Sequence, residues 1–222
     1  MQCSTKVVIQ CAARKRPGAG HLLSANRTPV LFVADPEAAP ADPAHEYARP
    51  DDPSGTGLSW SQVLLKYNAE TKSNPLGLYP AYQLYLHKTY QRLVERFGLE
   101  KVYVLSAGWG LIRADFLTPY YDITFSQSAE PYKRRRRTDH YEDFRMLADE
   151  PDEDIVFFGG KGYLALFGEL TDAIRSRKTV FYRSKDAPHM TGCTLRRFKT
   201  TTCTNWHYQC AKDFLDGAVK IQ

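Results

Sequence analysis

The segment from Val102 to Asp122 constrains the fold most, because it joins a continuous apolar run to a glycine-rich turn. Residues 102–105 are apolar and bounded by turn residues, which is typical of a strand buried on both faces in a parallel sheet. Gly108 and Gly110 follow, and glycine allows the backbone to turn sharply or to approach a ligand closely. Because ligands of open α/β sheets bind where strands end, we expect a functional site here.

Similar patterns along the chain predict the architecture. Further strands are predicted at residues 6–11, 155–158 and 179–182. Helices are predicted at residues 59–68, 80–97, 140–148, 163–175 and 207–215. This alternation favours an α/β fold with a mostly parallel central sheet of about four strands, flanked by helices on both faces. The carboxyl ends of the strands then share one edge, where we expect the loops to form a crevice.

The length of 222 residues favours a single domain over residues 1–222. Residues 35–57 are rich in Pro, Ala and Asp and show little periodicity, so we interpret them as a surface insertion or a mobile loop.

Two features of composition predict a soluble, cytoplasmic protein. No apolar run approaches the roughly 20 residues of a membrane-spanning helix, and residues 1–10 lack the pattern of a signal peptide. The five cysteines are an odd number with no Cys-x-x-Cys pair, which argues against a disulfide scaffold. We therefore expect reduced thiols.

The charge distribution suggests a polyanionic partner. The formal net charge is +5, with basic runs at 14–16 and 133–137 and an acidic run at 149–154. Five consecutive cations repel one another and would be stabilised by phosphates, although a solvated loop is an equally common explanation. Tyr132 and Tyr141 flank the longer basic run and can stack on exposed bases. The residues predicted to contact phosphate are Arg14, Lys15, Arg16, Lys133, Arg134, Arg135, Arg136, Arg137, Gly159, Gly160 and Lys161.

Three motifs together resemble one family. They are Cys11-Ala-Ala-Arg-Lys15, then Leu105-Ser-Ala-Gly-Trp-Gly-Leu-Ile112 with Asp115 and Pro119-Tyr-Tyr-Asp122, and Gly159-Gly-Lys-Gly-Tyr163. The chain resembles the YaaA-like superfamily, which includes DNA-binding peroxide-stress proteins and phage- and defence-associated relatives. The first loop is also similar to the Ser-Ala-Arg-Lys loop of a domain in archaeosine synthases. The resemblance covers most of the chain except residues 35–74 and implies a uracil-DNA-glycosylase-like fold.

The resemblance implies that the protein handles a nucleobase in DNA or RNA. Its sharpest implication is a DNA glycosylase that flips out a modified base and cleaves the N-glycosidic bond, in the setting of anti-phage defence. The Gly-Gln-Asp-Pro-Tyr and His-Pro-Ser loops of true uracil-DNA glycosylases are absent from the sequence, so specificity for uracil is not implied. A non-catalytic DNA-binding stress-response protein and an enzyme that modifies or transfers nucleobases are the alternatives.

Cleavage of a glycosidic bond requires a carboxylate that stabilises the developing positive charge or activates water. Asp122 is the first candidate and Asp115 the second, although each can instead be a turn residue. His207 is the candidate for protonating or hydrogen-bonding the base. The predicted base-binding residues are Ser106, Gly108, Trp109, Tyr120, Tyr121, Asn205 and Trp206. Core packing of Trp109 and helix capping by Asn205 are the competing interpretations.

No cofactor, metal or protein partner is expected, and DNA is the predicted partner. The Gly-Gly-Lys-Gly turn does not match a nucleotide-triphosphate loop, and no dinucleotide fingerprint is present. Cys193, Cys203, His207 and Cys210 are spaced too irregularly for a typical zinc site, so ordinary buried thiols are favoured. Cys11 follows the first strand and is either a core residue or a nucleophile.

Overall fold

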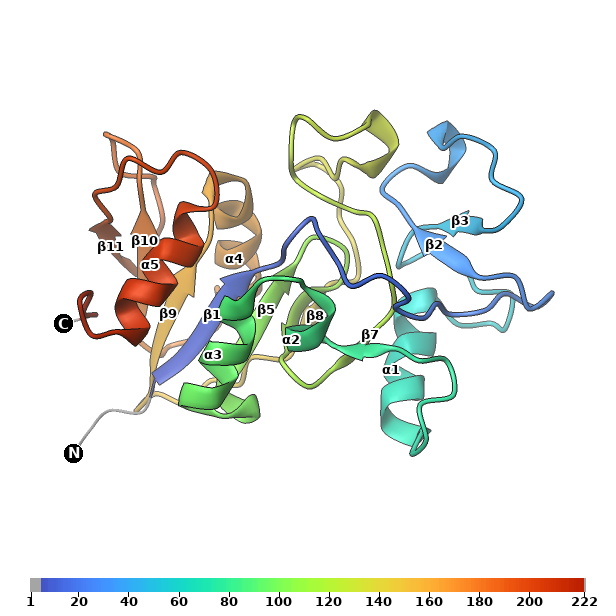
Figure 1. The fold of residues 1–222 in the computed structure, drawn as a ribbon, viewed down its shortest axis with the longest axis horizontal. Helices are drawn as coiled ribbons and strands as arrows, with labels where there is room; N and C mark the ends of the chain where they lie inside the picture. The colour runs from blue at the N-terminus through green and yellow to red at the C-terminus, as the bar shows by residue number, and fades with distance from the viewer. Residues whose placement is uncertain (1–4, 222) are drawn as a thin grey trace.

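A seven-stranded mixed sheet, mostly parallel, forms the centre of this single α/β domain in the computed structural model, which describes residues 5–221 (Figure 1). The strand order is β11-β10-β9-β1-β5-β6-β8. The strands are β1 (Thr5–Gln10), β5 (Val102–Ser106), β6 (Gly110–Arg113), β8 (Phe144–Arg145), β9 (Asp154–Phe158), β10 (Lys178–Tyr182) and β11 (Cys193–Arg197).

The four strands predicted from the sequence are confirmed, and they are neighbours in the sheet. Strands β10, β9, β1 and β5 are mutually parallel, with Ile9 of β1 paired to Phe158 on one side and to Val104 on the other. The sequence did not indicate β6, β8 or β11. Gly110 adopts a φ of 74°, a conformation that favours glycine, and β6 then returns antiparallel to β5. The glycine turn is therefore a hairpin.

Helices cover both faces of the sheet, as the alternation predicted. Phe157 of β9 stacks on Phe167 of α4 (Leu164–Leu170) with ring centroids 4.4 Å apart. The next residue, Phe158, lies 5.4 Å from Phe214 of α5 (Trp206–Leu215). Because successive side chains of a strand point to opposite faces, α4 and α5 lie on opposite sides of the sheet. Helix α3 (Lys88–Phe97) packs beside α5 (Figure 1).

Two predicted helices differ from the structure. Residues 80–97 form α2 (Ala81–Leu84) and α3, because Tyr85 is extended and the His87 ring accepts the Thr89 N–H at 3.3 Å to begin α3. The helix predicted at 140–148 is wrong. Phe144 instead donates its N–H to the Trp109 carbonyl at 3.0 Å, as part of the pairing of β8 with β6. A long-range strand partner therefore overrides the local helical pattern.

The remaining helices agree more closely with the sequence. Helix α1 (Trp60–Glu70) begins after Ser59 with a capping box that includes Gln62. The helix predicted at 163–175 is shorter and ends at Leu170, whereas α5 begins at Trp206 and ends at Leu215 as expected within a residue. The 3-10 helices are Pro36–Ala38, Leu99–Lys101, Pro131–Lys133 and Lys161–Tyr163.

The segment 35–57 belongs to a group of elements beyond the end of the sheet opposite β11. Its strand β3 (Glu46–Ala48) pairs in parallel with β2 (Val30–Phe32), and the nearby β4 (Tyr79–Pro80) pairs with β7 (Leu117–Thr118). Figure 1 shows β2, β3 and α1 together on the side away from β10 and β11. The segment 35–57 therefore contains a strand and a short 3-10 helix, which its lack of periodicity did not predict.

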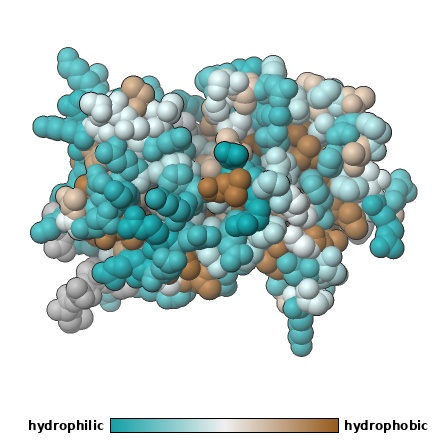
Figure 2. Space-filling view, viewed as in Figure 1, coloured by the Kyte–Doolittle hydropathy of each residue, from teal (hydrophilic) through white to brown (hydrophobic). Residues whose placement is uncertain are grey.

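The visible surface is mostly polar (Figure 2), and the described cysteines form no disulfide bond. The face seen in Figure 2 is mostly hydrophilic, with small separate hydrophobic patches. No helix in residues 5–221 has the length and apolar character needed to cross a membrane. Cys3 lies outside the described residues, and the other four cysteines are free thiols: Cys11, Cys193, Cys203 and Cys210.

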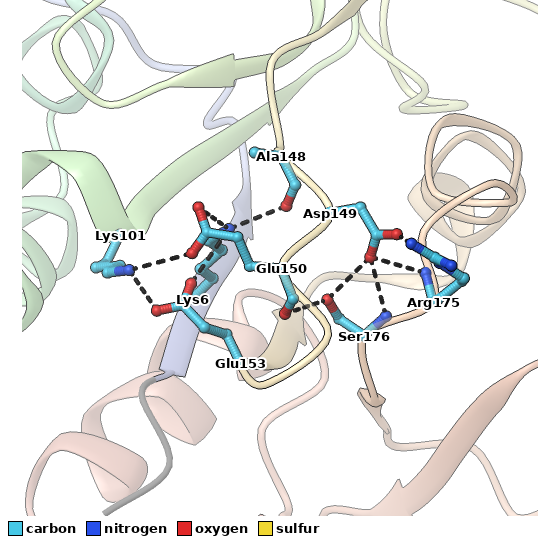
Figure 3. Close-up of polar contacts among 8 residues, drawn as sticks. All are labelled: Lys6, Lys101, Ala148, Asp149, Glu150, Glu153, Arg175 and Ser176. Atoms are coloured by element: carbon cyan, nitrogen blue, oxygen red, sulfur yellow. Dashed lines mark hydrogen bonds and ion pairs between the residues drawn. The ribbon is translucent and has the colours of Figure 1, made fainter.

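The acidic run at 149–154 neutralises basic side chains at the amino edge of the sheet (Figure 3). Lys6, only 2% exposed, forms ion pairs with Glu150 at 3.4 Å and Glu153 at 3.2 Å and donates to the Ala148 carbonyl at 2.9 Å. Lys101 pairs with the same two glutamates. The acidic run is therefore part of the fold and does not form a separate acidic surface.

We expect Lys6→Met to lower the free energy of unfolding by about 2 kcal/mol, because the buried Glu153 carboxylate loses one of its cationic partners and the Ala148 carbonyl loses its donor. Urea denaturation measures this loss. Arg175→Met is the control, since its side chain is 80% exposed and pairs with Asp149 at the surface, so its loss should be much smaller. Equal midpoints for Lys6→Met and the unmodified protein would contradict the assignment.

Candidate functional site

A cavity of about 1040 Å³ lies at the carboxyl edge of the parallel strands. This is slightly above the range of roughly 300–1,000 Å³ that is usual for ligand pockets. Its walls come from the segments after β1, β9 and β10, from the start of α5, and from two shorter pieces. The lining residues fall in the ranges 10–14, 86–87, 124–126, 159–164, 181–188 and 203–208.

The cavity unites three of the segments that the sequence singled out. Arg14, the 159–161 turn and the Asn205–His207 cluster are far apart in the chain, yet all line this one cavity. Parallel strands deliver their following loops to the same edge, which accounts for the first two. Helix α5 then contributes its first turn.

Positive charge predominates on the wall of the cavity. Arg14, Lys161 and Arg183 line it, and their side chains form no ion pair or hydrogen bond within residues 5–221. Asp186 is the only acidic residue among the lining residues. Such a wall attracts phosphate groups. Sequence reasoning missed Arg183 and Asp186. The only signal for Arg183 was its position directly after the strand predicted at residues 179–182, and Asp186 lies further along the same loop.

Aromatic rings form much of the remaining wall. The His87 ring stacks on Tyr208 with centroids 3.7 Å apart, and Phe125 meets Tyr163 edge-on at 5.0 Å. The Tyr163 hydroxyl forms a hydrogen bond with the Cys11 thiol at 3.1 Å. Nucleobases stack on such rings regardless of sequence. Cys11 is 4% exposed and lines the cavity through its place at the end of β1.

His207 lines the cavity, as predicted, but its protonation state differs from the expectation. The side chain is 4% exposed, and its Nε2 has no hydrogen-bond partner within the described part of the chain. Burial, and secondarily the nearby His87, lowers the pKa of His207 to about 3. The imidazole is therefore neutral near pH 7 and can donate or accept a hydrogen bond there, but cannot supply a proton as an imidazolium.

The two neighbours of His207 at this helix end have different roles. Asn205 has a φ of 60° and makes no side-chain hydrogen bond to the helix, so it is not a side-chain cap. Trp206 is 8% exposed and stacks on Phe198 at 6.2 Å.

The predicted catalytic acids lie outside this cavity. Asp115 forms an ion pair with Arg113 at the amino edge, because β6 runs back along β5. The Asp122 carboxylate is 30% exposed and pairs with Lys133 at 2.8 Å. Asp122 does not line the cavity, although Thr124 two residues later does.

The glycine turn itself is buried. Ser106 donates to the Tyr121 hydroxyl at 2.8 Å and accepts the backbone N–H groups of Gly108 and Trp109 at 3.2 and 3.1 Å. Trp109 is 1% exposed and packs 4.9 Å from Phe32, so the core-packing interpretation describes it. The structure therefore places these predicted base-binding residues in the core: Ser106, Gly108, Trp109 and Tyr121.

Two of the three basic residues after β1 also point away from the cavity. Lys15 is 6% exposed and lies 4.0 Å from the centre of the Tyr121 ring, and burial lowers its pKa. Arg16 donates to the Gln83 carbonyl at 3.2 Å. Tyr120 lines a second, smaller cavity of about 350 Å³.

The long basic run divides into buried and exposed side chains. Arg135 is buried, forms a bidentate pair with Asp143 at 2.9 and 2.5 Å, and donates to the Ala107 carbonyl at 3.0 Å. Lys133 is occupied by Asp122 and Glu130. The side chains that remain open to phosphate in this run are Arg134, Arg136 and Arg137.

The glycine turn after β9 is less available for phosphate binding than the sequence predicted. The Gly160 N–H donates to the Gln10 side chain at 2.6 Å, and a side chain at Gly159 would meet the Phe157 ring at 2.1 Å. Both glycines thus serve local packing, and Lys161 remains the residue of this turn that is open to phosphate.

No known protein family, curated protein or solved structure matches the chain. The YaaA-like resemblance therefore stays a prediction based on the sequence motifs. Within residues 5–221, no three His, Cys, Asp or Glu side chains are grouped as metal ligands.

We expect the combined change Arg14→Ala, Lys161→Ala and Arg183→Ala to weaken binding of single-stranded DNA. The slope of log K against log salt should become less negative by about 2, because about three phosphate contacts are lost. Titration of a fluorescent oligonucleotide at several salt concentrations measures both effects.

The control for this experiment is Arg27→Ala, Lys66→Ala and Lys72→Ala, which removes the same charge from exposed positions outside the cavity. A similar change in affinity and slope for the two triple variants would show that the cavity has no special role.

Proposed function

We propose that this protein is a DNA-binding enzyme that takes an extruded, modified nucleotide into the cavity and cleaves its N-glycosidic bond. On the wall of the cavity, three cations without ion-pair partners among residues 5–221 lie beside aromatic rings, and this arrangement supports the proposal. Phosphate and base are the two parts of a nucleotide that such groups bind. The YaaA-like motifs supply the link to glycosidic bonds and to anti-phage defence.

Stacking on the rings of the wall would offset the cost of removing a base from its helix, which is a few kcal/mol. The exposed Arg136 and Arg137 would hold the flanking backbone.

The geometry favours a different acid from the one the sequence favours. Among residues 5–221, Asp186 is the only carboxylate on the cavity wall, whereas Asp122 is held by Lys133 outside it. A carboxylate beside the sugar stabilises the positive charge that develops as the bond breaks. We therefore assign this role to Asp186 and keep Asp122 as the second choice.

A second candidate is DNA binding without catalysis. It is favoured by the ion pairs of both sequence-predicted acids, Asp115 with Arg113 and Asp122 with Lys133, and by the neutral state of His207. A base-transferring enzyme would use the same cavity but would require a second base as substrate.

We expect abasic sites to form when the protein is incubated with DNA that carries hydroxymethylated or glucosylated bases, and not with unmodified DNA. Alkaline cleavage of the products detects them. Asp186→Asn should lower the excision rate by about 100-fold or more while DNA affinity stays nearly unchanged.

Asp172→Asn is the matched control, because it removes an exposed carboxylate that pairs with Arg145 away from the cavity. Loss of excision in Asp122→Asn but not in Asp186→Asn would move the catalytic role to Asp122. Absence of abasic sites with every DNA would reject the enzyme and leave the binding protein.

A further inference from the structure

The N-terminus of α5 opens into the cavity with hydrogen-bond donors that the helix itself cannot satisfy. The helix has ten residues, and the first N–H groups of any helix lack an acceptor within it. The Tyr208 N–H is bonded to the Asn205 carbonyl at 3.0 Å, but the Asn205 side chain gives no cap hydrogen bond. The N–H groups of Trp206 and His207 have no acceptor within residues 5–221, and both residues line the cavity.

A second polar group, in the same turn, is independent of the helix backbone. The His207 side chain is 4% exposed, and its Nε2 is a buried polar atom without a hydrogen-bond partner among residues 5–221. A buried polar group without a partner costs free energy in a folded protein, so such atoms usually have a partner that the protein chain or a ligand supplies. As a neutral imidazole, His207 can offer an N–H to an anion at no cost in ionisation.

We infer that the N-terminus of α5 is a subsite for the phosphoryl group of a nucleotide, either free or within DNA. The positive end of the helix dipole and the free N–H groups favour an anion at this position. Lys161 and Arg183 line the same cavity and add positive charge. The inference deepens the proposed function: it assigns the phosphate to α5 and leaves the rings of Phe125 and Tyr163 for the base.

Binding of inorganic phosphate to the whole chain, followed by isothermal titration and by NMR of the His207 ring, tests the subsite directly. Asn205→Asp places a carboxylate at the helix end, where its negative charge repels phosphate. We expect the Kd for phosphate to rise about tenfold or more in this variant. The His207 ring signals should respond to phosphate in the unmodified protein and not in Asn205→Asp.

The matched control is Asn26→Asp, which makes the same chemical change in an exposed turn outside the cavity and should leave phosphate binding unchanged. His207→Gln is a second variant that leaves the helix end intact, and it should also weaken phosphate binding. Phosphate binding of unchanged strength in Asn205→Asp, or His207 signals that do not respond to phosphate, would overturn the inference.

Two further ligands separate the sources of the phosphate. A deoxynucleoside 5′-monophosphate that competes with inorganic phosphate, while an oligonucleotide does not, would identify a free nucleotide as the ligand. Competition by both supports DNA. Weaker phosphate binding in Asn205→Asp, together with no excision by the unmodified protein, would retain the subsite and reject the glycosylase. If Asn205→Asp binds phosphate and excises bases as well as the unmodified protein does, the glycosylase is retained and the subsite is rejected.

Discussion

The parallel pairing of β1 with both β5 and β9 is the constraint on which the rest of the structure depends. Ile9 is paired with Val104 on one side and with Phe158 on the other, so all three strands end at the same edge. The loops that follow must then meet there, whatever their sequence. The Tyr90 hydroxyl reinforces this edge, because it donates to the Gln10 carbonyl at 2.7 Å and contacts the Tyr208 hydroxyl at 2.9 Å. The cavity is a consequence of this topology.

Charge is distributed differently at the two edges of the sheet. At the amino edge, Lys6 and Lys101 are neutralised by Glu150 and Glu153. At the carboxyl edge, the cations that line the cavity have no acidic partner among residues 5–221. Like charges gathered on one wall repel one another, so they seldom stabilise a folded protein by themselves. An anionic ligand would relieve this repulsion, which is why we place the function at the carboxyl edge.

The sequence predicted the strands well because their signal is local. The buried strands of the main sheet that were predicted are short runs of apolar, often β-branched residues. A similar run at residues 30–34 was not predicted, and its strand β2 belongs to a separate two-stranded sheet. The hairpin that contains Trp109 was not predicted, since two glycines indicate a ligand loop as readily as a tight reversal. Strand β8 was missed for another reason: Phe144 is held by a hydrogen bond to the distant Trp109 carbonyl, which a local pattern does not reveal.

The candidate site was predicted only in part. Arg14, Lys161 and His207 were identified because they follow predicted strands or begin a predicted helix. The basic run misled the prediction because adjacent side chains have opposite surroundings, with Arg135 buried against Asp143 and Arg136 exposed. Asp186 could not be found, because it lies in a loop without a motif and gains its importance only from the residues around it.

Photochemical cross-linking shows whether a DNA base enters the cavity. The protein is mixed with an oligonucleotide that contains 5-iododeoxyuridine, and the complex is irradiated. Mass spectrometry then identifies the cross-linked peptides of the protein. We expect cross-links to aromatic residues of the cavity wall, such as Phe125, Tyr163 and Tyr208. Cross-links confined to the surface around β2, β3 and α1, with none on this wall, would contradict this expectation.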